Sequence, residues 1–321
     1  MYISRKFRII LSSLIKLRRL TGSKFRTSPP PMILYDNFNK RPEGVPTKMK
    51  TYNDQKRIIE HYDLVSPYYH SLWGKHLHHG YWITGKETKE EAQLALTKHL
   101  VEMANIKSGK KILDVGCGFG ASSIYLAKNY NADTIGITIS SIQVDLAQKA
   151  AAQAHVGSRF LLMDAEAMTF EPNSFDIIWS IESISHYKNK EIFFRNTAQL
   201  LKQGGTVAVI DWFKKENLSA DEDRKYITPI EKGMLVELRT MDNYVSILKS
   251  TGLEILKTEN LNKQTSKTWD ISLDIIKDKT FWRLALEHGS EFVNFLKAFR
   301  AMKNGFLSGN FVYGLIIAKK P

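Results

Sequence analysis

The segment KKILDVGCGFGASSIYLAKNY, residues 110–130, constrains the fold of this chain more than any other. A short apolar run ends in a turn that carries Gly116, Gly118 and Gly120 at alternate positions, and a helix-like stretch follows. Glycine lets the backbone lie close to a ligand, and the first N–H groups of the helix point toward that ligand. The pattern therefore predicts a strand at KILDV, a ligand-binding turn and a helix at ASSIYLAKNY, in this order.

Strand and helix patterns alternate along the chain after this turn. Further strands are predicted at DTIGITI, RFLLM, FDIIWS and GTVAVIDW, with helices at SIQVDLAQKAAAQA and KEIFFRNTAQLLK. Two helices are expected before the turn, within residues 53–73 and 89–106. The order βαβαβ predicts an α/β protein with a mostly parallel sheet, helices on both faces and a ligand at the carboxyl ends of the strands.

The glycine turn alone does not identify the ligand. Gly116, Gly118 and Ala121 also satisfy the dinucleotide pattern G-x-G-x-x-G/A, so an NAD-dependent oxidoreductase is one alternative. However, the carboxylate of Asp114, just before the turn, would repel a pyrophosphate and attract an amino group. The second strand ends at Thr138, where a dinucleotide enzyme needs an acid for the ribose hydroxyls. A nucleotide-like ligand other than NAD is therefore favoured.

Several motifs together resemble a known family. LDVGCGFG, GITISSIQ, DAEAMTF, FDIIWSIESISH and LLKQGGTVAVIDW have the order and spacing of class I S-adenosylmethionine-dependent methyltransferases. HYDLVSPYYHSLWGKHLHHGYW and GFLSGNFVYGLIIAKKP are similar to the tocopherol C-methyltransferase branch, which is related to sterol and cyclopropane-fatty-acid methyltransferases. The resemblance implies a Rossmann-like class I fold with a mostly parallel seven-stranded sheet and a helical cap. It also implies S-adenosyl-L-methionine as the cofactor.

The resemblance assigns the cofactor site residue by residue. The glycine loop would lie against the methionine part, with Asp114 toward its amino group. Thr138 and Gln143 would surround the ribose, with helix capping as the alternative, and Asp164 would accept the adenine amino hydrogen. The expected cofactor-binding residues are Tyr62, Asp114, Gly116, Gly118, Gly120, Thr138, Gln143, Asp164, Ala165 and Glu166.

Catalysis of methyl transfer from a sulfonium depends mainly on positioning the acceptor in line with the donor. Glu182 and His186 follow the fourth predicted strand, where either could remove a proton or stabilise developing positive charge. The family pattern ESxEH has a second glutamate where this chain has Ser185, and this departure leaves the acceptor open. We expect Glu182 and His186 to be catalytic, with a purely structural hydrogen bond as the alternative for Glu182.

The acceptor pocket is expected to be apolar and aromatic. Tyr68, Trp73, His79 and Tyr81 are the candidate lining residues, and residues 212–303 are expected to add a helical cap. The histidines near residue 78 lack the spacing of a zinc site, so no metal is expected.

These observations predict methyl transfer to a small, largely apolar acceptor such as a prenylated phenol, a terpenoid or an alkaloid-like compound of secondary or lipid metabolism, with carbon favoured as the methylated atom. The alternatives are a small-molecule N- or O-methyltransferase and an apolar-ligand carrier that kept the fold.

The first 48 residues differ in composition from the rest. The formal net charge is +13, and residues 1–35 contain eight Lys or Arg and no acid. Apolar residues at helical spacing predict a basic amphipathic helix, followed by a Pro-rich linker. We therefore divide the chain into an extension, 1–48, and a methyltransferase domain, 49–321. The helix could be an organelle transit peptide, a membrane-surface helix or an extension with neither role.

Composition also bears on location and partners. Cys117 is the only cysteine, so no intrachain disulfide forms, and this suits a cytoplasmic body. Organelle targeting or peripheral membrane contact would act through residues 1–30. No apolar stretch is long enough to span a membrane, and no basic stripe interleaved with aromatics indicates nucleic-acid binding. The oligomeric state is left open.

Overall fold

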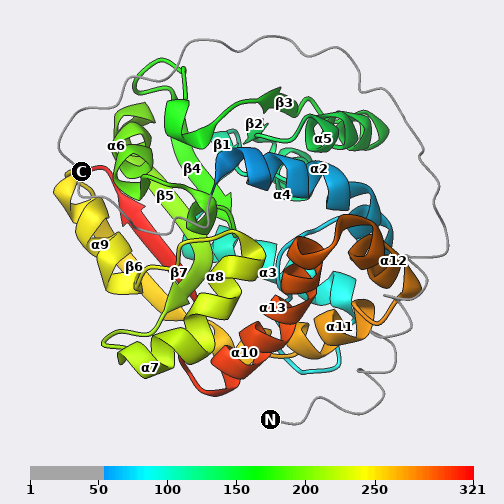
Figure 1. Ribbon diagram of the computed structural model, residues 1–321. Helices are drawn as coiled ribbons and strands as arrows, with labels where there is room; N and C mark the ends of the chain where they lie inside the picture. Colours follow the sequence, from blue (N-terminus) through cyan, green and yellow to red (C-terminus); the bar gives the residue numbers. More distant parts are fainter. Residues whose placement is uncertain (1–53) are drawn as a thin grey trace, which may run out of the picture. The chain divides into compact units, whose positions relative to one another are not determined.

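The computed structural model describes residues 54–321, and the expected extension and linker lie outside them. Seven strands form one sheet in the order β3-β2-β1-β4-β5-β7-β6 (Figure 1). The first five strands run parallel, and β7 is antiparallel to both of its neighbours. The predicted α/β fold is thus confirmed. The strands are β1 (Lys111–Val115), β2 (Asp133–Thr138), β3 (Arg159–Leu162), β4 (Phe175–Ile181), β5 (Leu201–Lys214), β6 (Glu254–Asn260) and β7 (Phe311–Lys319).

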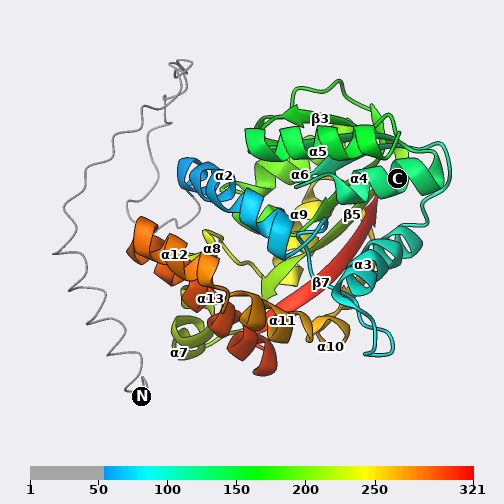
Figure 2. The same cartoon turned by 90° about the vertical axis from the view of Figure 1, so that its right-hand side faces the viewer.

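Helices cover both faces of the sheet (Figures 1 and 2). Apolar side chains of α3, α8, α11, α12 and α13 share one buried cluster with one sheet face, and α6 and α9 pack on the other. The main helices are α2 (Gln55–Leu72), α3 (Lys89–Met103), α4 (Ala121–Tyr130), α5 (Ser141–Gln153), α6 (Lys190–Leu200), α8 (Thr228–Met234), α9 (Met241–Ser250), α11 (Thr268–Ile275), α12 (Lys279–His288) and α13 (Ser290–Leu307). Short helical pieces are η1 (Ala165–Ala167), η2 (Ile184–His186), α7 (Ala220–Glu222), η3 (Asp223–Ile227) and α10 (Asn262–Thr265).

The segment expected to form a helical cap is mostly helical, but β6 interrupts it. The sequence of β6, EILKTEN, is rich in charged and polar residues, and most of its side chains are exposed. This strand pairs only with β7 in the described sheet. An edge strand with exposed side chains does not need alternating apolar residues, so the sequence pattern does not predict it. Strand β5 is also longer than predicted, because Leu201 pairs with Phe175 of β4 and Lys214 pairs with Phe311 of β7.

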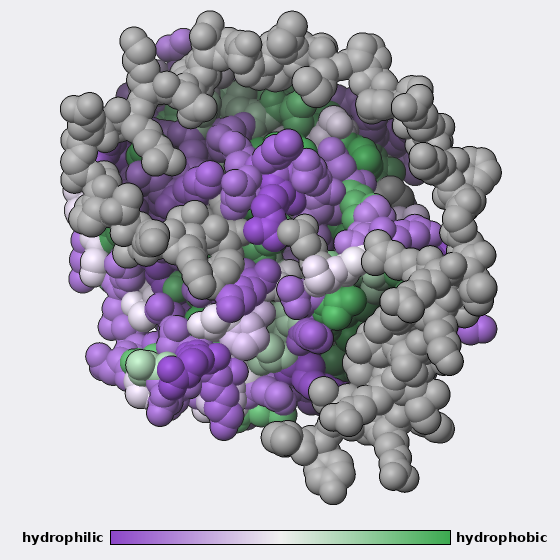
Figure 3. Space-filling model, viewed as in Figure 1, coloured by the Kyte–Doolittle hydropathy of each residue, from purple (hydrophilic) through white to green (hydrophobic). Residues whose placement is uncertain are grey.

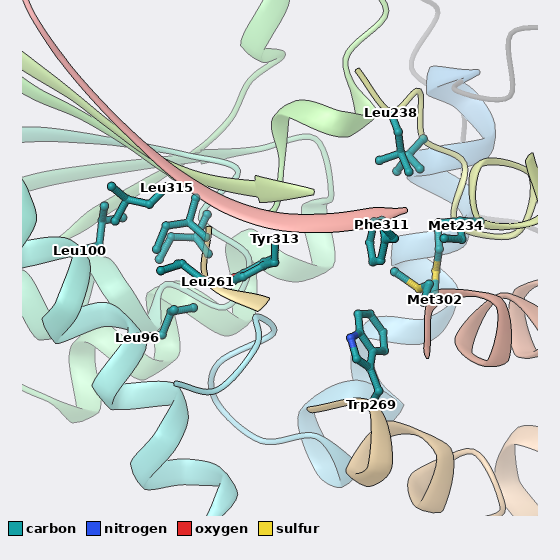
Figure 4. Close-up of a cluster of buried hydrophobic side chains, with 14 of the residues drawn as sticks. Leu96, Leu100, Met234, Leu238, Leu261, Trp269, Met302, Phe311, Tyr313 and Leu315 are labelled. Carbon is teal, nitrogen blue, oxygen red and sulfur yellow. The ribbon is translucent and has the colours of Figure 1, made fainter. Parts of the chain in front are cut away.

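Strand β7 joins the sheet to the cap. Alternate residues of a strand point to one face, and Phe311, Tyr313 and Leu315 follow this rule: in Figure 4 Phe311 lies beside Met302 of the cap, and Leu315 lies beside Leu100 of α3. They pack in the same cluster as Trp269 of α11 and Met302 of α13. The aromatic wall of the cap is therefore built directly on the sheet.

The glycine turn after β1 needs its glycines for two reasons. Gly116 and Gly120 both have φ near +76°, in the left-handed region that disfavours other residues. A Cβ at Gly116 would lie 2.0 Å from Oγ of Ser183, and one at Gly120 would lie 2.5 Å from the ring of Phe160. The turn is therefore pressed against the loop after β4 on one side and against β3 on the other.

Candidate active site

A cavity opens at the carboxyl ends of the parallel strands. Its walls come from the turns after β1, β2, β3 and β4, from α2, from residues 73–79, and from the cap helices α11 and α13. This is the edge of the sheet at which the sequence predicts a ligand. In Figure 3 hydrophobic side chains show between α2 and the α12–α13 pair, within a mostly hydrophilic surface.

The structure brings most of the predicted site residues together in this cavity. Gly120, Tyr68 and Tyr81 are not part of its lining: Gly120 faces β3, Tyr68 packs against the core, and Tyr81 stacks on His99 with ring centroids 4.6 Å apart. The predicted residues that do line the cavity are Tyr62, Trp73, His79, Asp114, Gly116, Gly118, Thr138, Gln143, Asp164, Ala165, Glu166, Glu182 and His186.

Asp114, Thr138 and Gln143 lie at the ends of β1 and β2. The Asp114 carboxylate is 3% exposed and accepts a hydrogen bond of 2.6 Å from the Ser123 hydroxyl. Burial raises the pKa of Asp114 to about 6, although the Ser123 bond opposes this shift. The Thr138 hydroxyl donates to Oε1 of Gln143 over 2.6 Å. The two residues that the resemblance assigns to the ribose are therefore in direct contact.

Asp164 and Glu166 have different tasks after β3. Asp164 caps η1 by accepting from the Glu166 amide over 2.8 Å, and its other oxygen accepts from Nε2 of Gln55 over 2.7 Å. The Glu166 carboxylate instead accepts from the amides of Lys188 and Asn189 and so braces the loop after β4. Gln55 was not predicted, because nothing in the local sequence indicates a contact across 109 positions.

The donor set of this half of the cavity fits S-adenosylmethionine. The buried Asp114 carboxylate suits an amino group, and neutral Thr138 and Gln143 suit ribose hydroxyls. A Cβ at Gly118 would lie 3.1 Å from Leu77, so the turn approaches the facing wall closely. A pyrophosphate at the glycine turn would face the carboxylate of Asp114, which repels it, so this part of the cavity does not suit NAD.

Glu182 follows β4 in a left-handed conformation, with φ +54°. Its Oε1 accepts three hydrogen bonds, from the His79 amide at 2.6 Å, from Nδ1 of His79 at 2.8 Å and from the Tyr313 hydroxyl at 2.6 Å. Burial by itself would raise the pKa of Glu182, but the charge and hydrogen bonds of His79 and the Tyr313 bond hold it below its ordinary value. Glu182 is therefore an ionised carboxylate. The partner Tyr313 was not predicted, although the C-terminal motif contains it.

His186 lies on η2 and is hydrogen-bonded through both ring nitrogens. Nδ1 lies 3.2 Å from the carbonyl oxygen of Leu235, which can only accept, so Nδ1 carries the hydrogen. Nε2 then accepts from the Tyr62 hydroxyl over 2.9 Å. Burial lowers the pKa of His186 to about 4, so the ring is neutral near pH 7. The Tyr62 hydrogen is thus donated to His186.

The other half of the cavity is apolar. Its lining residues are contributed by α2, β5 and the cap, and many are aromatic or sulfur-containing: Tyr69, Trp73, Trp212, Met234, Trp269, Phe295, Phe299 and Met302. This composition suits a ligand with a large apolar surface.

Asp211 is a buried carboxylate that the sequence analysis did not single out. It lies at the end of β5, is 0% exposed, and accepts hydrogen bonds from the amides of Trp212 and Ser185 at 2.7 and 2.9 Å. Burial raises its pKa to about 7, against the effect of these two bonds. Asp211 therefore ties η2, in the segment after β4, to strand β5.

The clustered histidines contact one another. Nδ1 of His76 lies 3.0 Å from Nε2 of His78, and burial lowers the pKa of His76 to about 3. Within residues 54–321, no three His, Cys, Asp or Glu side chains are grouped so that they could hold a metal ion.

Comparison with known proteins agrees with this geometry. The family model described as mycolic acid cyclopropane synthetase matches residues 49–310. A chloroplastic tocopherol O-methyltransferase of Arabidopsis thaliana is 30% identical over 294 residues, covering 83% of this chain and 82% of that protein. The 24-methylenesterol C-methyltransferase 2 of the same plant is 30% identical over 254 residues, covering 78% of this chain and 69% of that protein.

The fold is also found among solved structures. The mycolic acid cyclopropane synthase CmaA1, complexed with SAH and CTAB, superimposes with a TM-score of 0.74 at 20% identity and covers 85% of this chain and 99% of that chain. At this identity the match concerns the fold.

Proposed function

The chain belongs to the mycolic acid cyclopropane synthetase family and is an S-adenosylmethionine-dependent methyltransferase, and from this premise we propose that it methylates a small, largely apolar metabolite. The observation that carries the proposal is a cavity with two unlike halves. One half presents hydrogen-bonding groups at the ends of β1, β2 and β3, and the other presents aromatic and methionine side chains. A prenylated phenol, a terpenoid or an alkaloid-like compound matches the second half.

Carbon is the methylated atom that we favour, with N- or O-methylation of a small molecule as the alternative. The relatives are named as both O- and C-methyltransferases, which is compatible with either outcome. An aromatic cavity can stabilise positive charge that develops on a carbon acceptor, and a base can serve a hydroxyl or amine acceptor.

The residues are assigned these roles in the proposal. Asp114 and the turn with Gly116 and Gly118 hold the methionine part of the cofactor, Thr138 and Gln143 bind the ribose, and Asp164 and its neighbours bind the adenine. The bound cofactor supplies an electrophilic methyl group on a sulfonium. Glu182 offers a fixed negative charge beside the acceptor. His186, neutral and hydrogen-bonded to Tyr62, keeps this wall polar without adding a charge.

The first prediction concerns the ligands. S-adenosylhomocysteine should bind with micromolar or tighter affinity while NAD produces no heat in calorimetry, because the Asp114 carboxylate beside the turn repels a pyrophosphate. A donor carrying a labelled methyl group should then label one or more acceptors among prenylated phenols, terpenes, sterols and alkaloids. Tight NAD binding, or labelling of none of these classes, would contradict the proposal.

Targeting through the N-terminal residues also remains a proposal. No helix within residues 54–321 is both long enough and apolar enough to cross a membrane. The Arabidopsis tocopherol relative is named chloroplastic, which supports the transit-peptide interpretation of residues 1–30.

A further inference from the structure

His79 is held in one orientation by a buried carboxylate. The ring is 3% exposed, and its Nδ1 and its backbone amide both point to the same oxygen of Glu182, at 2.8 and 2.6 Å. An ionised carboxylate only accepts, so Nδ1 carries a hydrogen. The Tyr313 hydroxyl also donates to this oxygen, and its ring stacks on His79 with centroids 4.3 Å apart at 21°. In the neutral ring the lone pair is therefore on Nε2.

Nε2 of His79 is buried and has no hydrogen-bond partner among residues 54–321. A buried polar atom without a partner is costly, so such an atom in a cavity wall indicates that a ligand supplies the partner. The other histidines of the cavity differ. His186 uses both ring nitrogens, His78 contacts His76 and a carbonyl, and burial together with nearby His186 lowers the pKa of His61 to about 4. Among these histidines, only His79 has one ring nitrogen hydrogen-bonded to a carboxylate and the other buried without a partner.

The surroundings of His79 describe the missing partner. Trp269 meets the ring edge-on at 4.6 Å, and Trp212 does so at 6.1 Å. The indole N–H groups of both tryptophans are also buried without a partner in the described chain, and both residues line the cavity. The wall thus offers one acceptor nitrogen, two donors and otherwise apolar surface. A hydroxyl group satisfies such a set, because it donates once and accepts as well.

We infer that His79, oriented by Glu182, accepts a proton during methyl transfer, and that the acceptor substrate presents a phenolic or enolic hydroxyl to Nε2 of His79. An imidazole can take a proton from such a hydroxyl, whose acidity is near that of tyrosine, far more readily than from an alkanol. This inference rests on the proposed function and narrows its substrate class. It also gives Glu182 a positioning role in place of direct contact with the acceptor.

The step balances as follows. The O–H proton passes to Nε2, and the imidazolium that forms is paired with the Glu182 carboxylate. The bond from the methyl carbon to sulfur breaks with its electron pair left on sulfur, and a new bond forms to the hydroxyl oxygen or to a conjugated ring carbon. Attack from oxygen gives an ether, and the imidazolium then releases its proton to water. Attack from carbon gives a dienone, whose proton on the methylated ring carbon passes to water while the imidazolium returns its own proton to the oxygen. One proton leaves to water in either case.

Chemical rescue tests the role of His79. With a phenolic acceptor found in the labelled-donor screen, His79→Ala should lower kcat by roughly 10²–10⁴-fold, and imidazole in solution should restore part of it, more so for more basic imidazoles. His78→Ala is the matched control, because it removes a buried imidazole one position away and should gain nothing from added imidazole. Equal kcat for wild type and His79→Ala, or a loss that imidazole does not restore, would overturn the inference.

A measurement without turnover keeps the inference testable if His79→Ala does not fold. In ¹⁵N NMR the wild-type His79 ring should carry hydrogen on Nδ1 and a bare Nε2 near neutral pH. Glu182→Gln replaces the carboxylate behind Nδ1 with a neutral amide and should therefore change the ring ¹⁵N spectrum of His79. Hydrogen on Nε2 of the wild-type ring, or an unchanged ring spectrum in Glu182→Gln, would contradict the assignment. A wild-type enzyme that methylates only acceptors without a hydroxyl overturns this inference alone, whereas one that methylates nothing overturns the proposed function.

Discussion

Asp211 illustrates how much a single buried carboxyl group can influence this protein. Its two oxygens accept from the amide of Trp212 in β5 and the amide of Ser185 in η2, and no cation forms an ion pair with it among those found in residues 54–321. Burial raises its pKa to about 7, well above the ordinary value of 3.8. The folded chain therefore binds more protons than the unfolded chain between about pH 4 and pH 7.

This linkage predicts a pH dependence that Asp211→Asn should remove. A folded pKa above the unfolded one means that the contribution of Asp211 to stability is present at low pH and is lost as the pH rises to about 7. The free energy of unfolding of wild type relative to Asp211→Asn should therefore fall by up to a few kcal/mol between about pH 5 and about pH 8. Urea unfolding at both pH values measures the difference. The exposed Asp145→Asn is the control, and a constant difference for Asp211→Asn would contradict the assigned burial effect.

Some site residues could be predicted from the sequence and others could not. Asp114, Thr138 and Glu182 each end a strand of a parallel sheet, and such ends meet at one edge, so the pattern alone brings them together. Tyr313 and Gln55 reach the site across 131 and 109 positions through packing of α2 and β7. No local pattern specifies contacts of this kind. They depend on tertiary arrangement.

At the scale of elements, the glycine turn combines two functions that sequence alone does not separate. Gly116 and Gly118 line the cavity, whereas Gly120 starts α4 and faces Phe160 of β3 and Ala147 of α5. The family resemblance of the glycine loop assigns all three to the cofactor site. Gly120 instead permits close packing of two helices and a strand.

Gly120→Ala is expected to destabilise the fold without weakening the site. The new Cβ would meet the Phe160 ring at 2.5 Å and sit at positive φ, so the free energy of unfolding should drop by about 2 kcal/mol or more. S-adenosylhomocysteine affinity of the folded variant should change little. Gly157→Ala, which places its Cβ in open space, should stay within about 0.5 kcal/mol of wild type. A strong loss of S-adenosylhomocysteine affinity in Gly120→Ala, with an unchanged free energy of unfolding, would mean that Gly120 binds the cofactor.

Element boundaries were predictable where periodicity was strong. The helix predicted at ASSIYLAKNY and the strand at KILDV match α4 and β1 residue for residue. Strand β6 was not predicted, because an edge strand with exposed charges carries no apolar alternation. The ends of β5 were not predicted either, since they are set by pairing with β4 and β7.

At the scale of the whole molecule, residues 1–48 precede every motif of the methyltransferase domain and contain a Pro-rich break of their own. Deleting residues 1–48 should therefore leave the unfolding temperature and S-adenosylhomocysteine affinity unchanged. Thermal unfolding and calorimetry on the full and shortened chains check this. Loss of folding in the shortened chain would mean that the basic segment packs on the domain. Loss of binding to anionic vesicles alone would favour the membrane-surface role over the other two.

The sheet order has a consequence for how the protein is made. In the described sheet β6 pairs only with β7, yet α10 to α13 separate the two strands in the chain. During synthesis β6 therefore has no strand partner until the segment of about 50 residues that contains α10 to α13, and then β7, have left the ribosome. The exposed charged residues Glu254 and Lys257 make the unpaired β6 segment a poor template for pairing with other nascent chains. Strand β7, the last to be synthesised, also brings Tyr313 to Glu182, so the active site is completed only when β7 joins the sheet.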